Sequence, residues 1–136
     1  MQPAAIAMLF LMLSGLSGAQ TPALEQRLFV LLSPTDMERP PVAEMQTLQA
    51  AHLANIRSMA EDGLLLLAGP TRPVDVADRP VAGILAFASA DPDLVTSVTA
   101  RLARDPLIAG GYLRADQYVL FFETGDNLYE RRPREQ

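Results

Sequence analysis

The sequence of 136 residues predicts an α+β fold in which one four-stranded sheet is covered by two helices. Three observations support this fold class. Four short, strongly apolar runs are bounded by proline, glycine or acidic residues, which is typical of buried strands. Two longer segments repeat apolar residues at steps of three and four, which is typical of helices with one buried face. The elements follow one another as strand, helix, strand, strand, helix, strand.

The first strand is predicted at "RLFVLLS", from Arg27 to Ser33, where a continuous apolar run stops at Pro34. The first helix follows turn-forming residues and begins at Val42. Its apolar positions recur at helical spacing, and they are Val42, Met45, Leu48, Leu53, Ile56, Met59 and Ala60. We expect the helix to end at Glu61-Asp62-Gly63, because glycine suits the left-handed conformation that often follows a helix.

The second strand is predicted at "LLLLAGP", residues 64–70, and the third at "VAGILAFAS", from Val81 to Ser89. The segment between them, "TRPVDVADRP" at residues 71–80, is rich in proline and shows no sustained period. We therefore expect it to be a loop that connects the two strands.

The second helix is predicted to begin at Asp91, whose carboxylate would cap it, with Pro92 at the first helical position. It should run to about Arg104 and bury the apolar residues Leu94, Val95, Val98 and Leu102. The fourth strand is predicted at "DQYVLFFE", from Asp116 to Glu123.

This order is the split βαβ pattern of a ferredoxin-like βαββαβ sandwich. Two helices on one face of the sheet leave its other face uncovered. Strands as apolar as "LFVLL", "LLLLA" and "YVLFF" cannot leave that face in water. Hydrophobicity alone therefore predicts that two sheets pair in a homodimer.

The beginning of the chain differs from the rest, because no charged residue precedes Glu25. An apolar run at residues 6–16 is too short to span a bilayer comfortably, and "SGA" at residues 17–19 offers the small residues that signal peptidase requires. We expect a signal peptide over residues 1–19, export to the periplasm or the extracellular space, and no stable membrane anchor after cleavage. The competing interpretation is an uncleaved N-terminal anchor. One domain, residues 20–136 with a core at 27–123, would remain, with a short polar C-terminal tail.

Charge and cysteine content argue against a nucleic-acid partner, disulfide bonds and a lipoprotein anchor. The net charge is −5, all basic residues are arginine, and their one cluster is "RRPR" at residues 131–134. Nucleic acid is not an expected partner, because binding to a phosphate backbone needs a positive face. The absence of cysteine excludes disulfides and a lipoprotein anchor.

His52 is the one histidine of the chain. It lies one helical turn after Leu48 and one before Ile56, so it shares the buried face of the first helix. Two interpretations are open: a core histidine satisfied by a backbone carbonyl, or a general acid or base. Both predict burial, but only the second predicts a cavity beside the ring.

Asp105 is a candidate partner for this histidine. It lies at the end of the second helix, where the helix dipole disfavours a negative charge, so some other group should hold it. In one interpretation Asp105-Pro106 ends the helix and the carboxylate caps the following turn. In the other, the carboxylate orients or charges His52, or faces the same substrate.

Other constellations that would carry chemistry are weak. With one histidine and no cysteine, a zinc or haem site lacks its usual ligands within one chain, and we expect no metal site. Gly110-Gly111 lacks the strand, the spacing and the lysine of a phosphate-binding loop. No serine stands in a nucleophile elbow.

Taken together, "HLANIRSMAEDGLLLLAGP", the glycine of "VAGILAF" and "ARDPLIAGGYLRADQYVLFF" resemble the YCII-related (YciI-like) family over roughly residues 28–122. The matching positions are His52-Leu53, Gly63, Ala68-Gly69-Pro70, Gly83, Asp105-Pro106 and Ala109-Gly110. The resemblance implies a ferredoxin-like fold that pairs as a dimeric α/β barrel. It also implies a site in which His52 and Asp105 meet, and acid/base elimination on small cyclic or aromatic substrates without a cofactor.

The sequence departs from the family pattern at two places near this site. Leu107 stands where an aromatic residue commonly follows the Asp-Pro pair, which would reshape the pocket. Gln49 stands where some members carry an arginine, so an anionic substrate would lose one possible clamp. The export signal is also atypical, because familiar members are cytoplasmic.

Three functions follow as hypotheses. The first is an exported enzyme in which His52, held by Asp105, exchanges a proton with a compact substrate. Gly69 and Pro70 would form the rim of its pocket, because glycine lets a ligand approach the backbone closely. The second is a non-catalytic homodimer that binds a small ligand or has a structural role outside the cytoplasm. The third, a relative of the dimeric α/β-barrel oxygenases, is disfavoured because the YCII-like pattern already uses His52.

Overall fold

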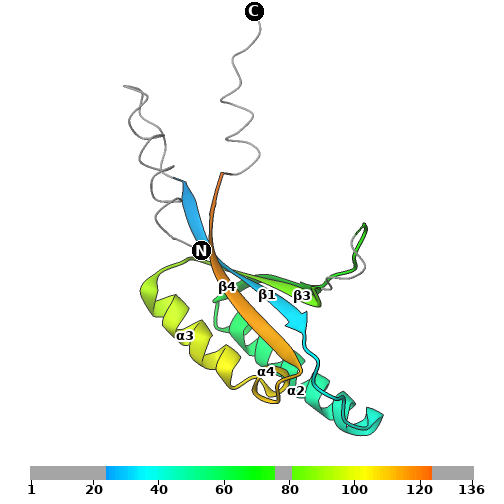
Figure 1. Ribbon diagram of the computed structural model, residues 1–136. Helices are drawn as coiled ribbons and strands as arrows, with labels where there is room; N and C mark the ends of the chain where they lie inside the picture. The colour runs from blue at the N-terminus through cyan, green and yellow to red at the C-terminus, as the bar shows by residue number, and fades with distance from the viewer. Residues whose placement is uncertain (1–23, 76–80, 124–136) are drawn as a thin grey trace, which may run out of the picture.

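The computed structural model describes residues 24–75 and 81–123. In chain order its elements are β1 (Glu25–Pro34), α2 (Val42–Glu61), β2 (Leu65–Pro70), β3 (Gly83–Phe87), α3 (Pro92–Ala103), α4 (Pro106–Ala109) and β4 (Leu113–Phe122) (Figure 1). The signal peptide predicted over residues 1–19 and the C-terminal tail lie outside the described residues.

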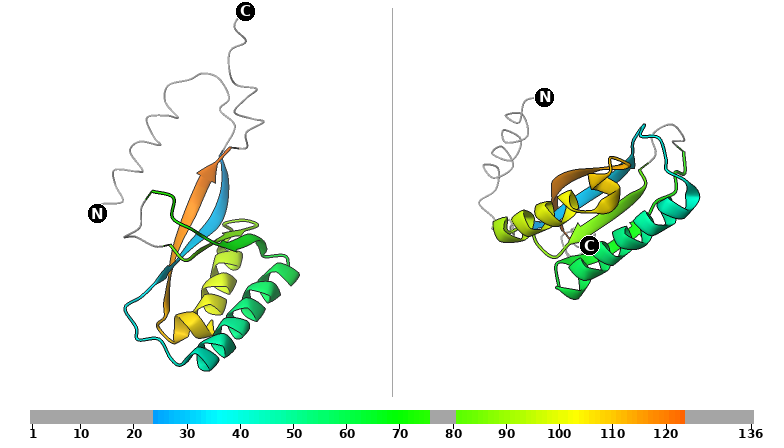
Figure 2. Two further views of the ribbon diagram at one scale, coloured as in Figure 1. Left: turned by 90° about the vertical axis from the view of Figure 1, so that its right-hand side faces the viewer. Right: turned by 90° about the horizontal axis from the view of Figure 1, so that it is seen from below.

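The four strands form one antiparallel sheet in the order β2-β3-β1-β4. Helices α2 and α3 lie beside each other on the same face of this sheet, which is clearest when the molecule is seen from below (Figure 2). The predicted α+β class and the predicted order of strands and long helices are confirmed. This arrangement is compatible with the ferredoxin-like βαββαβ sandwich.

Two features at the end of the domain were not predicted. The short helix α4, Pro106–Ala109, has four residues, which is too few to show a helical period. Strand β4 begins at Leu113, three residues before the predicted start at Asp116. The start was missed because charged residues interrupt the apolar pattern there. Arg114 and Asp116 lie two positions apart on one face of the strand and form an ion pair, with Arg114 Nε 2.9 Å from Asp116 Oδ2.

The start of α3 corrects one prediction. Asp91 occupies the position before the helix and Pro92 its first turn, but the carboxylate of Asp91 makes no capping hydrogen bond. Instead, the backbone N–H of Asp91 donates to Ser89 Oγ at 3.2 Å. The serine two residues upstream therefore organises this turn.

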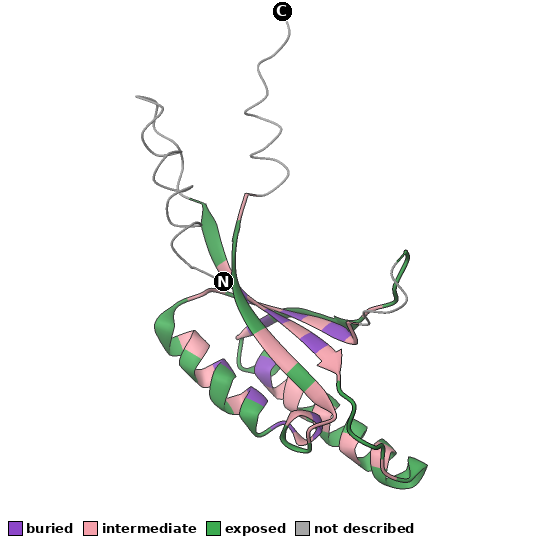
Figure 3. Ribbon diagram, in the orientation of Figure 1, coloured by how far each residue is buried: buried purple, intermediate pink, exposed green. Residues whose placement is uncertain are grey.

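Helix α2 buries less of its apolar face than its sequence predicts. Met59 is its one buried residue, whereas Val42 is 75% and Leu53 57% exposed. The first half of α2 extends past the end of the sheet, and Figure 3 shows that half largely as exposed. The end of the helix is as predicted, because Gly63 follows it with a φ of +74°.

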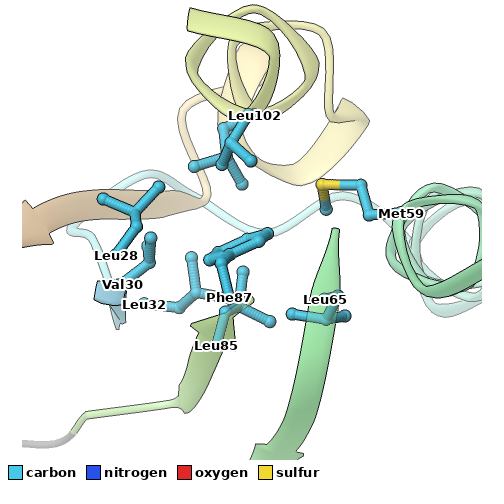
Figure 4. Close-up of a cluster of buried hydrophobic side chains, with 9 residues drawn as sticks. Leu28, Val30, Leu32, Met59, Leu65, Leu85, Phe87 and Leu102 are labelled. Carbon is cyan, nitrogen blue, oxygen red and sulfur yellow. The ribbon is translucent and has the colours of Figure 1, made fainter. Parts of the chain in front are cut away.

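The core lies between the sheet and the two long helices (Figure 4). Alternate residues of β1 and β3 point into it, as the two-residue period of a strand requires. Its buried members are Leu28, Val30, Leu32, Met59, Leu65, Leu85, Phe87, Val98 and Leu102. Leu94 and Val95 of α3, which were predicted to be buried, are partly buried and pack at its margin.

No described helix packs on the other face of the sheet (Figure 2). Phe29 of β1 pairs with Tyr118 of β4, so both side chains lie on this face. Tyr118 is 54% exposed and Leu120, two residues further along the strand, is 46% exposed.

None of the helices in the described part of the chain has the length and hydropathy of a membrane span.

Candidate active site

His52 and Asp105 meet at the junction of α2 with the short helix α4. The distances from His52 Nδ1 to the two carboxylate oxygens of Asp105 are 2.9 and 2.8 Å. The His52 side chain is 12% exposed, and that of Asp105 is 1% exposed. The structure therefore brings together the two residues that the sequence singled out, and it buries the carboxylate behind the imidazole ring.

Asp105 also caps α4. Its Oδ1 accepts a hydrogen bond from the backbone N–H of Leu107 at 3.0 Å. The two interpretations of Asp105 are thus compatible, because one carboxylate has enough lone pairs to cap the turn and to hold the histidine at once.

Asn55 is a third member of the cluster that sequence reasoning missed. Its Nδ2 donates to Asp105 Oδ2 at 3.0 Å and to the backbone carbonyl of Arg101 at 3.3 Å. The signal was present in the sequence, because Asn55 stands three residues after His52 and so lies on the same face of α2. The amide and the imidazole therefore share Oδ2 of the carboxylate.

Opposing effects set the ionisation of Asp105. Burial alone would raise its pKa, but the hydrogen bonds from His52 and Asn55, the charge of His52 and the N–H of Leu107 outweigh it, and the pKa lies below the ordinary value of 3.8. Asp105 is therefore a carboxylate at neutral pH. Since a carboxylate only accepts hydrogen bonds, we assign a proton to His52 Nδ1, which leaves Nε2 with the lone pair when the ring is neutral.

His52 lines a cavity of about 480 Å³ at the end of the sheet. Helix α2 contributes Met45, Gln49 and Leu53 to its wall. The remaining wall comes from the end of β1 and the loop after it, from the residues between β2 and β3, and from the segment that runs from α4 to the start of β4. Its residues are Pro34, Thr35, Met37, Arg39, Thr71, Pro73, Val81, Ala82, Leu107, Tyr112 and Leu113. A volume of this size suits a small organic molecule.

A second cavity, of about 310 Å³, is also lined by His52 and is mostly apolar. Gly69 and Pro70 line this cavity and not the first one. His52, Leu53, Ala82 and Leu113 line both cavities, so the imidazole stands where the two spaces meet.

The backbone of β2 lies close to β3 at this second cavity because residue 83 is glycine. A Cβ atom on Gly83 would lie 3.1 Å from the carbonyl oxygen of Gly69, which is tighter than side chains normally allow. Gly83 is buried, and Gly69 pairs with the neighbouring Ile84. The glycine of "VAGILAF" therefore sets the separation of the two strands that form the cavity wall.

The two departures from the YciI-like pattern also fall at the site. Leu107 is 7% exposed and lines the larger cavity with an aliphatic side chain. Gln49 lines the same cavity. Arg39, in the loop before α2, lines it as well and was not among the expected site residues. A single arginine in a loop belongs to no local motif, so it could not be identified from the sequence.

Groups of three or more residues that could hold a metal ion are absent from residues 24–75 and 81–123.

Comparisons with known proteins do not assign a family. No family model matches the chain, and no curated protein matches it. Among solved structures, it is similar to 5-chloro-2-hydroxyhydroquinone dehydrochlorinase (TftG) from Burkholderia phenoliruptrix AC1100 in complex with 2,5-dihydroxybenzoquinone. The identity is 19%, the match covers 74% of this chain and 97% of the other, and the TM-score is 0.45. A likeness at this level does not transfer a reaction, and membership of the YciI-like family stays a prediction from the motifs.

Proposed function

We propose that this protein is a YciI-like enzyme that removes a proton from a small cyclic or aromatic substrate without a cofactor. The observation that carries the proposal is the His52–Asp105 pair, whose histidine borders two cavities while its carboxylate is 1% exposed. A histidine that served only packing would need no open space beside the ring.

His52 is the proposed general base. Its Nδ1 is occupied by Asp105, and its Nε2 has no hydrogen-bond partner among the described residues. Asp105 holds the ring in one orientation and stabilises the imidazolium that forms when Nε2 accepts a proton. Asn55 is a positioning residue, because it acts on Asp105 and lines neither of the two cavities.

The proposed reaction class is proton abstraction or elimination. Nε2 takes a proton from a carbon that a neighbouring carbonyl or an electron-poor ring makes acidic. The electron pair of the broken C–H bond then forms a double bond, either as a leaving group departs from the adjacent carbon with its bonding pair or as charge moves onto the carbonyl oxygen. The imidazolium can return the proton to the leaving group or to another carbon of the substrate.

We further propose that the protein acts as a homodimer, paired as a dimeric α/β barrel, outside the cytoplasm. The apolar sheet face that bears Tyr118 and Leu120 supports the dimer, because a monomer would expose it to water. The uncharged, apolar first residues and the "SGA" at residues 17–19 support export. N-terminal sequencing of the exported protein tests this part, and a first residue of Gln20 is the expected result.

A hydrogen-exchange assay tests the chemistry before the natural substrate is known. Small unsaturated lactones and hydroxylated quinols are incubated with the protein in deuterium oxide, and replacement of C–H by C–D is followed by NMR. We expect exchange with the wild-type protein and its loss in His52→Gln, which keeps the size of the side chain but removes the base. Gln46→Ala is the matched control, because Gln46 is exposed on the same helix and lines neither cavity.

An unchanged exchange rate in His52→Gln would overturn the role of His52 as base. Binding of a lactone or quinol with no exchange in the wild-type protein would instead favour the second hypothesis, a non-catalytic dimer that binds a small ligand.

A further inference from the structure

We propose that Arg39 is an anion-binding residue of this site, and that the substrate is a small acid whose carboxylate binds Arg39 while its apolar body lies in the smaller cavity. This inference deepens the proposed function and rests on it for the position of the reacting carbon.

Among the described residues, Arg39 is the one arginine that lines the larger cavity, and no described carboxylate lines it. Asp105 lies behind His52 and is 1% exposed, and Asp36 and Glu38, which precede the arginine in its loop, are not part of the wall. A chain with a net charge of −5 therefore places a positive charge in the wall of its candidate site.

The guanidinium of Arg39 has no ion pair or hydrogen bond with any described residue. Three other arginines form ion pairs: Arg27 with Glu25, Arg101 with Asp62 and Arg114 with Asp116. Arg57 and Arg72 are unpaired like Arg39 among the described residues, but neither lines the larger cavity. Arg39 thus keeps all its N–H donors for a ligand, in a planar fork that matches a carboxylate.

The other polar side chains of the cavity wall differ in whether they already form a hydrogen bond within the protein. The hydroxyl of Thr35 donates to the carbonyl of Gly111, and that of Thr71 donates to the carbonyl of Val81. The side-chain amide of Gln49 and the phenol hydroxyl of Tyr112 have no hydrogen-bond partner among the described residues. The described wall of the larger cavity therefore offers Arg39 and two neutral polar groups to an oxyanion, although Gln49 stands where some members of the YciI-like family carry an arginine.

The smaller cavity is suited to the other end of such a molecule. Leu32, Ile56 and Ile84 contribute apolar side chains to its wall, and Gly69 adds no side chain that would fill it. Because His52 borders both cavities, a molecule with its carboxylate at Arg39 and its ring in the smaller cavity passes the imidazole. A carbon between the acid group and the ring is then the one that faces the base.

Binding of benzoate, compared with its neutral analogue benzamide, tests this inference in the purified protein. NMR titration of the ring signals of His52 follows each ligand, and assignment is simple because the chain has one histidine. We expect benzoate to bind more tightly than benzamide, and Arg39→Gln to weaken benzoate by about tenfold or more while leaving benzamide unchanged. Arg39→Lys should recover part of the loss, because it restores the charge without the planar fork.

Arg57→Gln is the matched control, because it makes the same charge change at an exposed arginine of α2 outside the larger cavity. The inference is wrong if benzoate does not bind the wild-type protein, if Arg39→Gln binds it equally well, or if Arg57→Gln weakens it as much. This experiment measures binding and not turnover, so its outcome is independent of the hydrogen-exchange assay. A negative result for Arg39 would not contradict the role of His52 as base, and a negative exchange result would not contradict anion binding by Arg39.

Discussion

Asp105 ties the beginning of α4 to the middle of α2 through His52, whose Nδ1 lies 2.8 Å from Asp105 Oδ2 across 53 residues of sequence. The carboxylate that caps α4 is thus also the group that orients the candidate base on α2. Its structural and chemical roles can be separated by substitution, because Asn retains the shape of the side chain and loses its charge.

Asp105→Asn is expected to lower the rate of proton abstraction by about a hundredfold or more, since the amide no longer stabilises the imidazolium. In the wild-type protein, ¹⁵N NMR should show the neutral ring of His52 with its proton on Nδ1. The variant should show a mixture of the two tautomers, because an amide can also donate to the ring. Asp62→Asn, at an exposed carboxylate paired with Arg101, is the control. A single unchanged tautomer and an unchanged rate in Asp105→Asn would contradict the proposed pair.

The lowered pKa of Asp105 predicts how the free energy of unfolding depends on pH. Because the pKa in the folded protein lies below its ordinary value of 3.8, the ionised carboxylate stabilises the folded state in full above that value. This contribution is lost as the pH falls through the folded-state pKa. Urea unfolding between about pH 6 and pH 3 should therefore show a steeper acid loss for the wild-type protein than for Asp105→Asn. Parallel profiles would contradict the prediction.

Asn55→Ala should shift that acid loss to higher pH. The substitution removes one of the hydrogen bonds that lower the pKa of Asp105, so the pKa rises toward its ordinary value. It should also reduce the free energy of unfolding by about 1–2 kcal/mol, because a buried carboxylate oxygen loses one of its two donors. Gln46→Ala, exposed on the same helix, should change neither quantity. An Asn55→Ala profile that matches this control would mean that Asn55 does not set the state of Asp105.

Two glycines that lie close together at the smaller cavity should respond oppositely to alanine. Gly83→Ala should lower the free energy of unfolding by about 1–3 kcal/mol, since its Cβ would meet the carbonyl oxygen of Gly69 at 3.1 Å and force β2 away from β3. Gly69→Ala should be neutral or stabilising by up to about 1 kcal/mol, because nothing lies within 4 Å of its Cβ position. Chemical denaturation measures both. Equal losses would show that backbone freedom and not close approach requires Gly83.

The elements with strong local patterns could be predicted from the sequence. Gly63 marked the end of α2, and the apolar runs marked all four strands, because these signals depend on residues close together in the chain. The buried face of α2 was overestimated, since the period of a helix does not tell how far the sheet beneath it extends. Val42 is helical as predicted yet 75% exposed, because the helix there has passed the end of the sheet.

The site could be predicted only in part for a related reason. His52 and Asp105 stood out as chemically unusual residues at constrained positions, and their contact is in the structure. Arg39 is unremarkable in sequence, and only the path of the loop before α2 places it in the cavity wall. Asn55 could have been found from helical spacing, but its partner could not, because Asp105 reaches it through tertiary packing.

The uncovered sheet face predicts the assembly state. Tyr118 pairs with Phe29 on this face and remains 54% exposed, so a second sheet that packs there would bury both rings. We expect a dimer in sedimentation velocity, and we expect Tyr118→Glu to convert it to monomer, because a carboxylate buried between two sheets would lack a partner. Ala100→Glu adds the same charge at an exposed position of α3, on the opposite side of the sheet, and should remain dimeric. A wild-type monomer, or a dimer that Ala100→Glu breaks and Tyr118→Glu does not, would place the interface elsewhere and leave the apolar face without an explanation.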